Sequence, residues 1–347
     1  MNKGTMKAAV LRQKGGPEIL RVEEWPIPKP GFGQALVRVR ACGVCNHEVV
    51  VRSPDLTHKS YHPPQVLGHE IAGEVVELGE RAHELKVGDR VTCTNKSSCR
   101  VCERCRRDDE IHCPNGDMNE GGYGEFAAIN EESLVKIPEG MPFEHAAICG
   151  CAVGIALRGV RWAARVAVGE TALVTGPSGG IGAHSVQLAR LAGARVIAAT
   201  TSEDKAEALR QLGADEVVVT GGKPYHKQVM ALTGGHGVDV VIDTVGSAVF
   251  ESAFRSMGYH ARYVLIGEFY GDTLPVSAAW MFRKETTLQG SGAAHRSELE
   301  DCLCLLHEGK IKPVIAKTYP LAQIADVHRE MERKKHVGRL VITYNQA

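Results

Sequence analysis

Four cysteines stand close together in a polar stretch of this chain, at Cys99, Cys102, Cys105 and Cys113. Their spacing is C-x2-C-x2-C-x7-C, and each short step bends the backbone so that two sulfurs face one point. Four thiolates in this pattern complete the tetrahedral coordination of Zn²⁺ and leave no position for water or substrate. The spacing therefore predicts a structural zinc lobe over about residues 95–115, with reduced surface thiols or disulfides as the alternative.

The composition bounds what the rest of the chain can be. With 347 residues and 44% hydrophobic content, two domains with buried cores are expected. Lysine plus arginine and aspartate plus glutamate balance at 41 each, so no global field favours nucleic acid or an anionic membrane. No apolar run reaches about 18 residues, and the first residues lack a signal-peptide core. Of the 11 cysteines, those left outside the metal-binding motifs show no disulfide framework, and this usage indicates a reducing cytoplasm.

The order of strand and helix patterns predicts an α/β fold with two domains. Short alternating runs in the first fifty residues indicate an antiparallel, barrel-like catalytic domain over 1–156, to which the chain returns over 293–347. Between them, over 157–292, strands alternate with helices as in the doubly wound parallel sheet of a Rossmann domain. The predicted strands of that sheet are Thr171–Thr175, Arg195–Thr200, Glu216–Val219, Val238–Ile242, Arg262–Ile266 and Thr286–Gln289.

A glycine-rich turn separates the first of these strands from a helix. Such glycines let a pyrophosphate approach the backbone, and the helix N-terminus stabilises its charge. The position between a strand and a helix, with another strand about twenty residues on, predicts a dinucleotide site. Gly246 and Gly267 fall at strand ends where the nicotinamide and its ribose are expected. The residues of the turn are Gly176, Ser178, Gly179, Gly180, Ile181 and Gly182.

The end of the second strand bears on which dinucleotide binds. An NAD site usually has a carboxylate here to bind the ribose 2′-hydroxyl. This chain has Thr200, Thr201 and Ser202 instead, followed by Lys205. Hydroxyls and a lysine suit a 2′-phosphate, so the sequence favours NADP(H), with NAD(H) as the alternative because no arginine stands at the pocket.

Taken together, these motifs resemble the zinc-dependent medium-chain alcohol dehydrogenases. The spacing of the four cysteines is that of the family's structural zinc lobe. The stretch from Gly68 to Gly79 resembles the family's G-H-E-x2-G-x5-G signature, and the glycine turn has the G-x-x-G-G-x-G form of its quinone-reductase-like branch. The resemblance extends from Met6 to Ile342.

The resemblance implies a second, catalytic zinc. Its ligands are implied to be Cys45, His69 and a third cysteine, for which the family's register favours Cys151 over Cys149. Glu70 either ligates the metal or stands just behind it.

The resemblance also implies roles for three residues around that metal and the cofactor. Glu48 occupies the position of an acidic residue that orients the ligating histidine. Arg339 follows a glycine, as in a family pair whose arginine reaches the cofactor phosphates; a solvated strand-edge charge is the alternative. His47 stands where the family usually has serine or threonine to pass the alcohol proton, and it either transfers that proton itself or packs against the substrate.

Family membership implies hydride transfer between a nicotinamide and a small alcohol, aldehyde or ketone, with zinc as the Lewis acid. The missing hydroxyl keeps a second reaction open, the NADPH-dependent reduction of the C=C bond of an α,β-unsaturated carbonyl or enoyl thioester. A non-catalytic dinucleotide-binding protein is a third possibility, which the intact ligand set disfavours. A homodimer or homotetramer formed through the edge of the cofactor sheet is expected, with neither nucleic acid nor a membrane as partner.

Overall fold

The computed structural model describes residues 4–54, 61–268 and 271–344, and the chain divides into two compact units. The first unit comprises Met1–Gly154, Ala293–Gly309 and Ile315–Ala347. The second comprises Ile155–Gly292 together with Lys310–Val314, a short return segment that the sequence-based boundaries did not include. The α/β class predicted from the sequence is confirmed.

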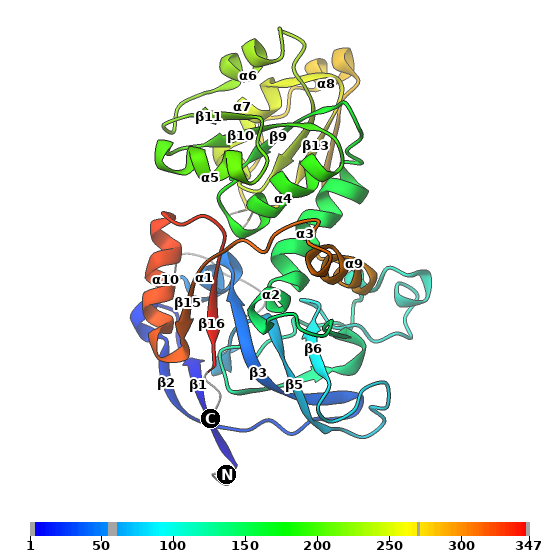
Figure 1. Cartoon of the computed structure of the whole chain (residues 1–347), viewed down its shortest axis with the longest axis vertical. Helices are drawn as coiled ribbons and strands as arrows, with labels where there is room; N and C mark the ends of the chain where they lie inside the picture. Colours follow the sequence, from blue (N-terminus) through cyan, green and yellow to red (C-terminus); the bar gives the residue numbers. More distant parts are fainter. Residues whose placement is uncertain (1–3, 55–60, 269–270, 345–347) are drawn as a thin grey trace. The chain divides into compact units, whose positions relative to one another are not determined.

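The first unit is built on two sheets. The larger sheet has the order β15-β16-β3-β5-β6-β8, with β7 also paired to β3, and the smaller has the order β2-β1-β4. Figure 1 shows the last strand, β16 in red, running beside β3 in blue, so opposite ends of the chain complete one sheet. The strands are β1 (Thr5–Leu11), β2 (Arg21–Pro26), β3 (Gln34–Val44), β4 (Gln65–Val66), β5 (Glu70–Leu78), β6 (Arg90–Cys93), β7 (Phe126–Asn130), β8 (Leu134–Lys136), β15 (Ile315–Pro320) and β16 (Arg339–Thr343).

The antiparallel character expected for this unit needs one correction. Its strands pair antiparallel except for β15 and β16, which are parallel and therefore make the larger sheet mixed. Parallel neighbours need a crossover connection, and helix α10 (Ile324–Arg333) supplies it between these two strands. The signal for β15 in the sequence is weak because four of its six side chains are exposed and one is buried.

Helices of the first unit are short and connect the strands. They are α1 (Asn46–Arg52), α2 (Phe143–Ala147), α9 (Arg296–His307) and α10, with 3₁₀ turns at Pro17–Ile19, Cys105–Arg107, Glu110–His112, Glu131–Ser133 and Leu321–Gln323. The core between sheets and helices contains fully buried side chains such as Val37, Ile71 and Leu340. Burying apolar area of this kind stabilises a fold by about 25 cal/mol per Å².

The second unit is an open parallel sheet with strand order β11-β10-β9-β12-β13-β14 (Figure 1). The order reverses beside β9, which is the switch point where such sheets bind nucleotides. The strands are β9 (Thr171–Thr175), β10 (Arg195–Thr200), β11 (Glu216–Val219), β12 (Val238–Asp243), β13 (Met257–Leu265) and β14 (Thr287–Gly290). The helices are α4 (Gly180–Leu191), α5 (Ala206–Gln211), α6 (His226–Leu232), α7 (Ser247–Arg255) and α8 (Ala278–Lys284), with a 3₁₀ turn at Glu203–Lys205.

One helical stretch, Phe143–Ala163, changes its winding along its length. It begins as α2, passes through π-helical turns at Cys149–Val153 and Arg158–Ala163, and contains α3 (Gly154–Leu157) between them. Within the described ranges, this is the one helix long and apolar enough to cross a membrane, and 72% of its most apolar window is buried inside the protein. Core helices of water-soluble proteins have the same composition.

Candidate metal centres and cofactor turn

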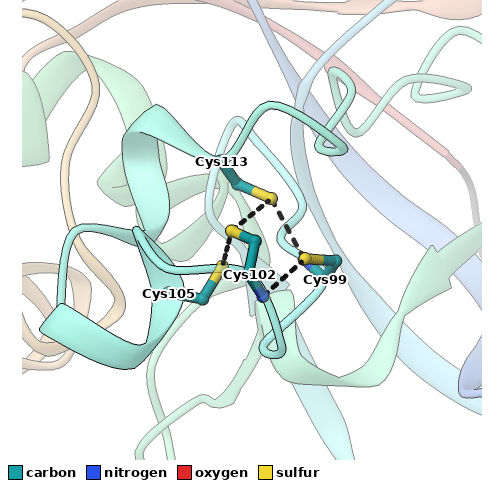
Figure 2. Close-up of side chains that lie close together, drawn as sticks. All are labelled: Cys99, Cys102, Cys105 and Cys113. Carbon is teal, nitrogen blue, oxygen red and sulfur yellow. Dashed lines mark hydrogen bonds between the residues drawn. The ribbon is translucent and has the colours of Figure 1, made fainter.

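The four clustered cysteines converge on one point (Figure 2). Cys102 Sγ lies 3.5 Å from Cys105 Sγ and 3.9 Å from Cys113 Sγ. Four sulfurs at 2.3 Å from a zinc ion have tetrahedral edges of about 3.8 Å. Two short 3₁₀ turns and the intervening bends place these thiols, as their spacing predicted. The donor set fits a structural zinc.

Backbone and side-chain donors favour the thiolate form at one cysteine of this cluster, Cys99. Cys99 Sγ accepts hydrogen bonds from Asn115 Nδ2 at 3.5 Å and from the Cys102 amide at 3.4 Å. These bonds, the one from Asn115 first, lower the pKa of Cys99 to about 6. Thiolate is the form that binds metal. Burial, followed by the side chains of Cys102 and Cys113, raises the pKa of Cys105 to about 12, so the thiols of the lobe differ in how readily they ionise.

A second donor set lies in the buried interior of the first unit. It consists of Cys45, His69, Glu70 and Cys151, whose ligand atoms all lie within 4.8 Å of one another. The Sγ atoms of Cys45 and Cys151 are 4.0 Å apart, again close to the edge of a zinc-centred tetrahedron. Every one of the four residues is buried. Two thiols and an imidazole, with a carboxylate behind them, fit the donor chemistry of a catalytic zinc.

Separate elements carry these donors. Cys45 is the residue before α1, His69 is the residue before β5, and Glu70 is the first residue of β5. Cys151 is at the centre of the π-helical turn Cys149–Val153. Such turns are rare and often mark functional sites, and nothing in the sequence signalled this one. The turn points Cys151 at the other donors, while Cys149 Sγ donates to the His145 carbonyl oxygen, so the structure assembles Cys151 rather than Cys149 into the donor set.

Glu48 connects two of these donors. Its Oε2 accepts from the Cys45 amide at 2.9 Å, which caps α1, and its Oε1 lies 2.5 Å from His69 Nδ1. The carboxylate fixes the ring proton on Nδ1 and leaves the Nε2 lone pair for a metal. Burial alone lowers the pKa of His69, but Glu48 and Cys45 together outweigh it and the pKa is raised. This placement supports the orienting role expected for Glu48, which stays a prediction.

Arg339 lies among the donors rather than at the surface. Its guanidinium is buried, with Nη2 2.8 Å from Glu70 Oε1 and 3.8 Å from Cys151 Sγ. Burial raises the pKa of Glu70 to about 7, and the positive charge of Arg339 acts against that rise. A solvated strand-edge charge is thereby excluded for Arg339, and its contact with cofactor phosphates stays a prediction.

His47 also stands beside this site, together with an acid that the sequence did not single out. The His47 and His69 rings meet edge-on with centroids 5.2 Å apart, and His47 Nε2 lies 4.0 Å from Glu120 Oε1. Burial, with the nearby Glu48 charge, raises the pKa of Glu120 to about 7. Glu120 directly precedes a Gly-Gly-Tyr-Gly sequence. This sequence predicts a turn of the chain, but it does not predict a functional role for the acid beside it.

The glycine-rich turn of the second unit has the shape that a dinucleotide requires. Gly176 has φ +58°, and Gly179 precedes the first turn of α4. A Cβ on Gly182 would lie only 2.1 Å from the Gly176 carbonyl oxygen, so a larger residue cannot occupy that position. The first backbone amides of α4 have no partner within the helix, which suits a pyrophosphate.

The hydroxyl-rich end of β10 lies beside this turn. Lys205 Nζ donates to Ser178 Oγ at 3.3 Å, which joins the two motifs that the sequence assigned to the cofactor. Thr200 Oγ1 accepts from the Ser202 amide at 3.5 Å. Lys205 is buried, and this burial lowers its pKa. A buried cation beside hydroxyls suits a phosphate better than a neutral ribose hydroxyl.

Gly246 and Gly267 follow β12 and β13, as predicted. A buried acid nearby accepts hydrogen bonds from the residues around them. Asp243, the last residue of β12, accepts hydrogen bonds from Tyr263 Oη at 2.6 Å and from the Gly246 amide at 3.1 Å. Gly246 has φ +90°, and a Cβ on Gly267 would lie 2.5 Å from the Thr244 carbonyl oxygen. Sequence reasoning missed Asp243 because a carboxylate at a strand end has many other uses.

Comparisons with known proteins agree with this architecture. Residues 31–139 match the alcohol dehydrogenase GroES-like domain, and residues 180–308 match the zinc-binding dehydrogenase domain. The chain is 34% identical to the acryloyl-coenzyme A reductase of Sulfurisphaera tokodaii, over 97% of this chain and 99% of that protein. The chain belongs to the zinc-type medium-chain dehydrogenase/reductase family. It is accordingly an oxidoreductase that uses zinc and a nicotinamide cofactor.

Other members lie at a similar distance. An alcohol dehydrogenase of Geobacillus stearothermophilus is 33% identical over 97% of this chain and 99% of its own length. The crystal structure of AibC is 39% identical and superposes with a TM-score of 0.91, covering 99% of this chain and 97% of that one. Relatives with different named substrates are therefore about equally similar in sequence.

Proposed function

We propose that this protein transfers hydride between NADP(H) and a small alcohol or carbonyl compound whose oxygen faces Cys45, His69 and Cys151. The observation that carries the proposal is the buried convergence of these donors, with the two sulfurs 4.0 Å apart. A Zn²⁺ held there would act as a Lewis acid toward the substrate oxygen, and a bound nicotinamide would exchange the hydride. We further propose two zinc ions per chain, one in each donor set.

The protein's own residues orient the histidine donor, balance the negative charge of the other donors and supply a group for proton transfer. Glu48 holds the His69 imidazole in the tautomer that leaves Nε2 free. Arg339 offsets part of the negative charge of the thiolates and Glu70. His47 is the group positioned to exchange a proton with the substrate oxygen, in place of the absent hydroxyl, because its imidazole lies against His69.

A second candidate reaction is the reduction of the C=C bond of an enoyl thioester or related unsaturated carbonyl. His47 in place of the family hydroxyl favours it, since hydride addition to carbon does not need an alcohol relay. The similarity to a protein named acryloyl-coenzyme A reductase favours it as well. In this reaction the same donors would polarise the conjugated carbonyl.

A product assay separates these two reactions. The zinc-loaded protein is supplied with NADPH or NADH and with butanal, crotonal or crotonyl-coenzyme A, and the products are identified by mass and NMR. Formation of butanol from butanal is the expected result of carbonyl chemistry. Saturation of crotonal or the thioester, with butanal left unchanged, would instead establish C=C reduction. Turnover of none of these would favour the non-catalytic dinucleotide-binding alternative.

The preference for NADP(H) gives a mutational prediction. Lys205→Ala is expected to raise the KM for NADPH about tenfold and to change the KM for NADH less than about twofold, because a charge-assisted contact to phosphate contributes roughly 1.5–3 kcal/mol. Lys284→Ala is the control: this lysine is partly buried, and its Nζ binds the carbonyl oxygen of Met257, the first residue of β13, which lies on the other side of β9 from β10 in the same sheet. Equal effects of Lys205→Ala on both cofactors would contradict a 2′-phosphate site.

We also propose a cytoplasmic location and a homo-oligomer. All 11 cysteines are free thiols in the structure, which fits a reducing compartment. Among the residues that the structure describes, strand β14 pairs with β13 on one edge and with no strand on the other, and such edges readily pair with a second copy. Light scattering of the purified protein would distinguish dimer from tetramer.

A further inference from the structure

A fully buried arginine lies behind the second metal site. Arg52 is 2% exposed, and each of the three nitrogens of its guanidinium has a polar partner. Its Nε donates to His328 Nδ1 at 3.4 Å, while its two terminal nitrogens bind the Gly15 carbonyl oxygen and Glu332 Oε1. On the other side of the imidazole, His328 Nε2 lies 3.2 Å from Tyr123 Oη. Helix α10 contributes both His328 and Glu332 to this group.

The direction of each hydrogen bond follows from the chemistry of the arginine. A guanidinium has no acceptor, so His328 Nδ1 must accept from it. The imidazole proton therefore stands on Nε2 and is donated to Tyr123 Oη. Burial, together with the Arg52 charge, lowers the pKa of His328 to about 3, so the ring is neutral and keeps this tautomer. The three side chains form one directed chain of hydrogen bonds.

Both ends of this chain reach a segment that carries a metal donor. Arg52 is the last residue of α1, and Cys45 directly precedes the first turn of the same seven-residue helix. At the other end, the Tyr123 ring packs against Gly68, the residue before His69. A Cβ on Gly68 would lie 2.7 Å from Tyr123 Cδ1, and the Tyr123 amide donates to the Leu67 carbonyl oxygen at 2.9 Å.

We propose that Arg52, His328 and Tyr123 are positioning residues that set the separation of the Cys45 and His69 donors. The hydrogen bonds fix α1 at one end and the Gly68 turn at the other against a common support, α10. A buried charge is costly unless it is fully paired, and an apolar side chain would fill the same space without that cost. We therefore attribute the buried charge to a need for a fixed geometry, namely the separation between α1 and the segment that carries His69.

The test measures metal binding to the full-length protein, not turnover. Tyr123→Phe removes one hydroxyl, and Arg52→Lys keeps the charge but loses the planar guanidinium that reaches three partners. Tyr263→Phe is the matched control, because Tyr263 is equally buried and its hydroxyl binds Asp243 in the second unit. Zinc affinity is measured by competition with a chromogenic chelator, and the lobe zinc serves as an internal reference. Co²⁺ substitution reports the donor geometry through its absorption bands.

We expect Tyr123→Phe and Arg52→Lys to weaken zinc binding at the second site about tenfold, the size seen when residues supporting metal ligands are changed. The lobe zinc should be retained, and the Co²⁺ bands should shift. Tyr263→Phe should match the unmodified protein. Unchanged affinity and bands in both network variants would overturn the proposal, as would equal weakening by Tyr263→Phe.

The inference rests on the proposed metal site, and the two can fail separately. If the unmodified protein binds only the lobe zinc, the metal site itself is wrong and the network has nothing to position. If the unmodified protein binds two zinc ions, and Tyr123→Phe and Arg52→Lys show the same zinc affinity and Co²⁺ bands, the proposal of the metal site is supported and only the positioning role is rejected.

Discussion

Replacing Cys45 with serine is expected to lower kcat/KM by about a thousandfold or more, while the protein keeps its fold and one zinc ion per chain. Loss of a single preorganised electrostatic group already costs about 10²–10³ in rate, and this substitution removes one of two thiolates from a buried site. The hydrogen bond from Cys151, followed by the charges of Arg339 and His69, lowers the pKa of the Cys45 thiol. A serine hydroxyl would not ionise there.

Cys149→Ser is the matched control for this experiment. Cys149 is as buried as the donors and lies two residues from Cys151, but its thiol donates to the His145 carbonyl oxygen, which a serine hydroxyl can also do. Zinc content by mass spectrometry, circular dichroism and turnover would be measured for both variants. Two zinc ions in Cys45→Ser, or loss of activity in Cys149→Ser alone, would show that the wrong sulfurs have been assigned.

Replacing Cys102 with serine is expected to lower the thermal stability of the protein. Cys102 lies at the centre of the lobe, within 4.0 Å of two other sulfurs. The lobe has two helical turns of three residues each and few buried apolar side chains, Ile111 among them. Such short turns do not persist in water alone, and binding of a structural zinc supplies folding free energy directly. We expect the lobe zinc to be lost and the Tm to fall by roughly 5–15 °C.

Cys304→Ser is the control for that substitution, since Cys304 is an exposed thiol on α9 outside both donor sets. Its Tm should stay within about 1 °C of the unmodified protein. The comparison uses differential scanning calorimetry with excess zinc and again with a chelator. A Tm for Cys102→Ser equal to that of the control would mean that the lobe is stable without its metal.

Features whose residues all lie in one short stretch of the chain could be predicted from the sequence. The zinc lobe has all four donors within fifteen residues, so their spacing alone fixes their convergence. The strands Thr171–Thr175, Arg195–Thr200 and Glu216–Val219 have the same bounds in the structure as in the sequence-based prediction. Continuous apolar runs between turns are the mark of buried parallel strands. The glycine-rich turn could also be predicted, because all of its residues lie in one short stretch of the chain.

The second metal site was predictable only in part. Its donors come from positions 45, 69, 70 and 151, and a resemblance to known motifs suggested them before any contact was visible. The choice of Cys151 over Cys149 depends on a π-helical turn, which side-chain periodicity does not encode. Glu120 beside His47 and Arg339 beside Glu70 had no signal of their own, because a single charged residue in a sequence is most often solvated.

The sequence by itself determined the α/β class, the zinc lobe and the dinucleotide turn, because each depends on residues that are neighbours in the chain. Tertiary structure alone decided which distant side chains meet. Arg52 and His328 are separated by 276 positions, and nothing local requires a buried guanidinium to bind a neutral imidazole. Only the folding of α10 against α1 brings them together, since side-chain contacts across such separations are set by packing and not by spacing.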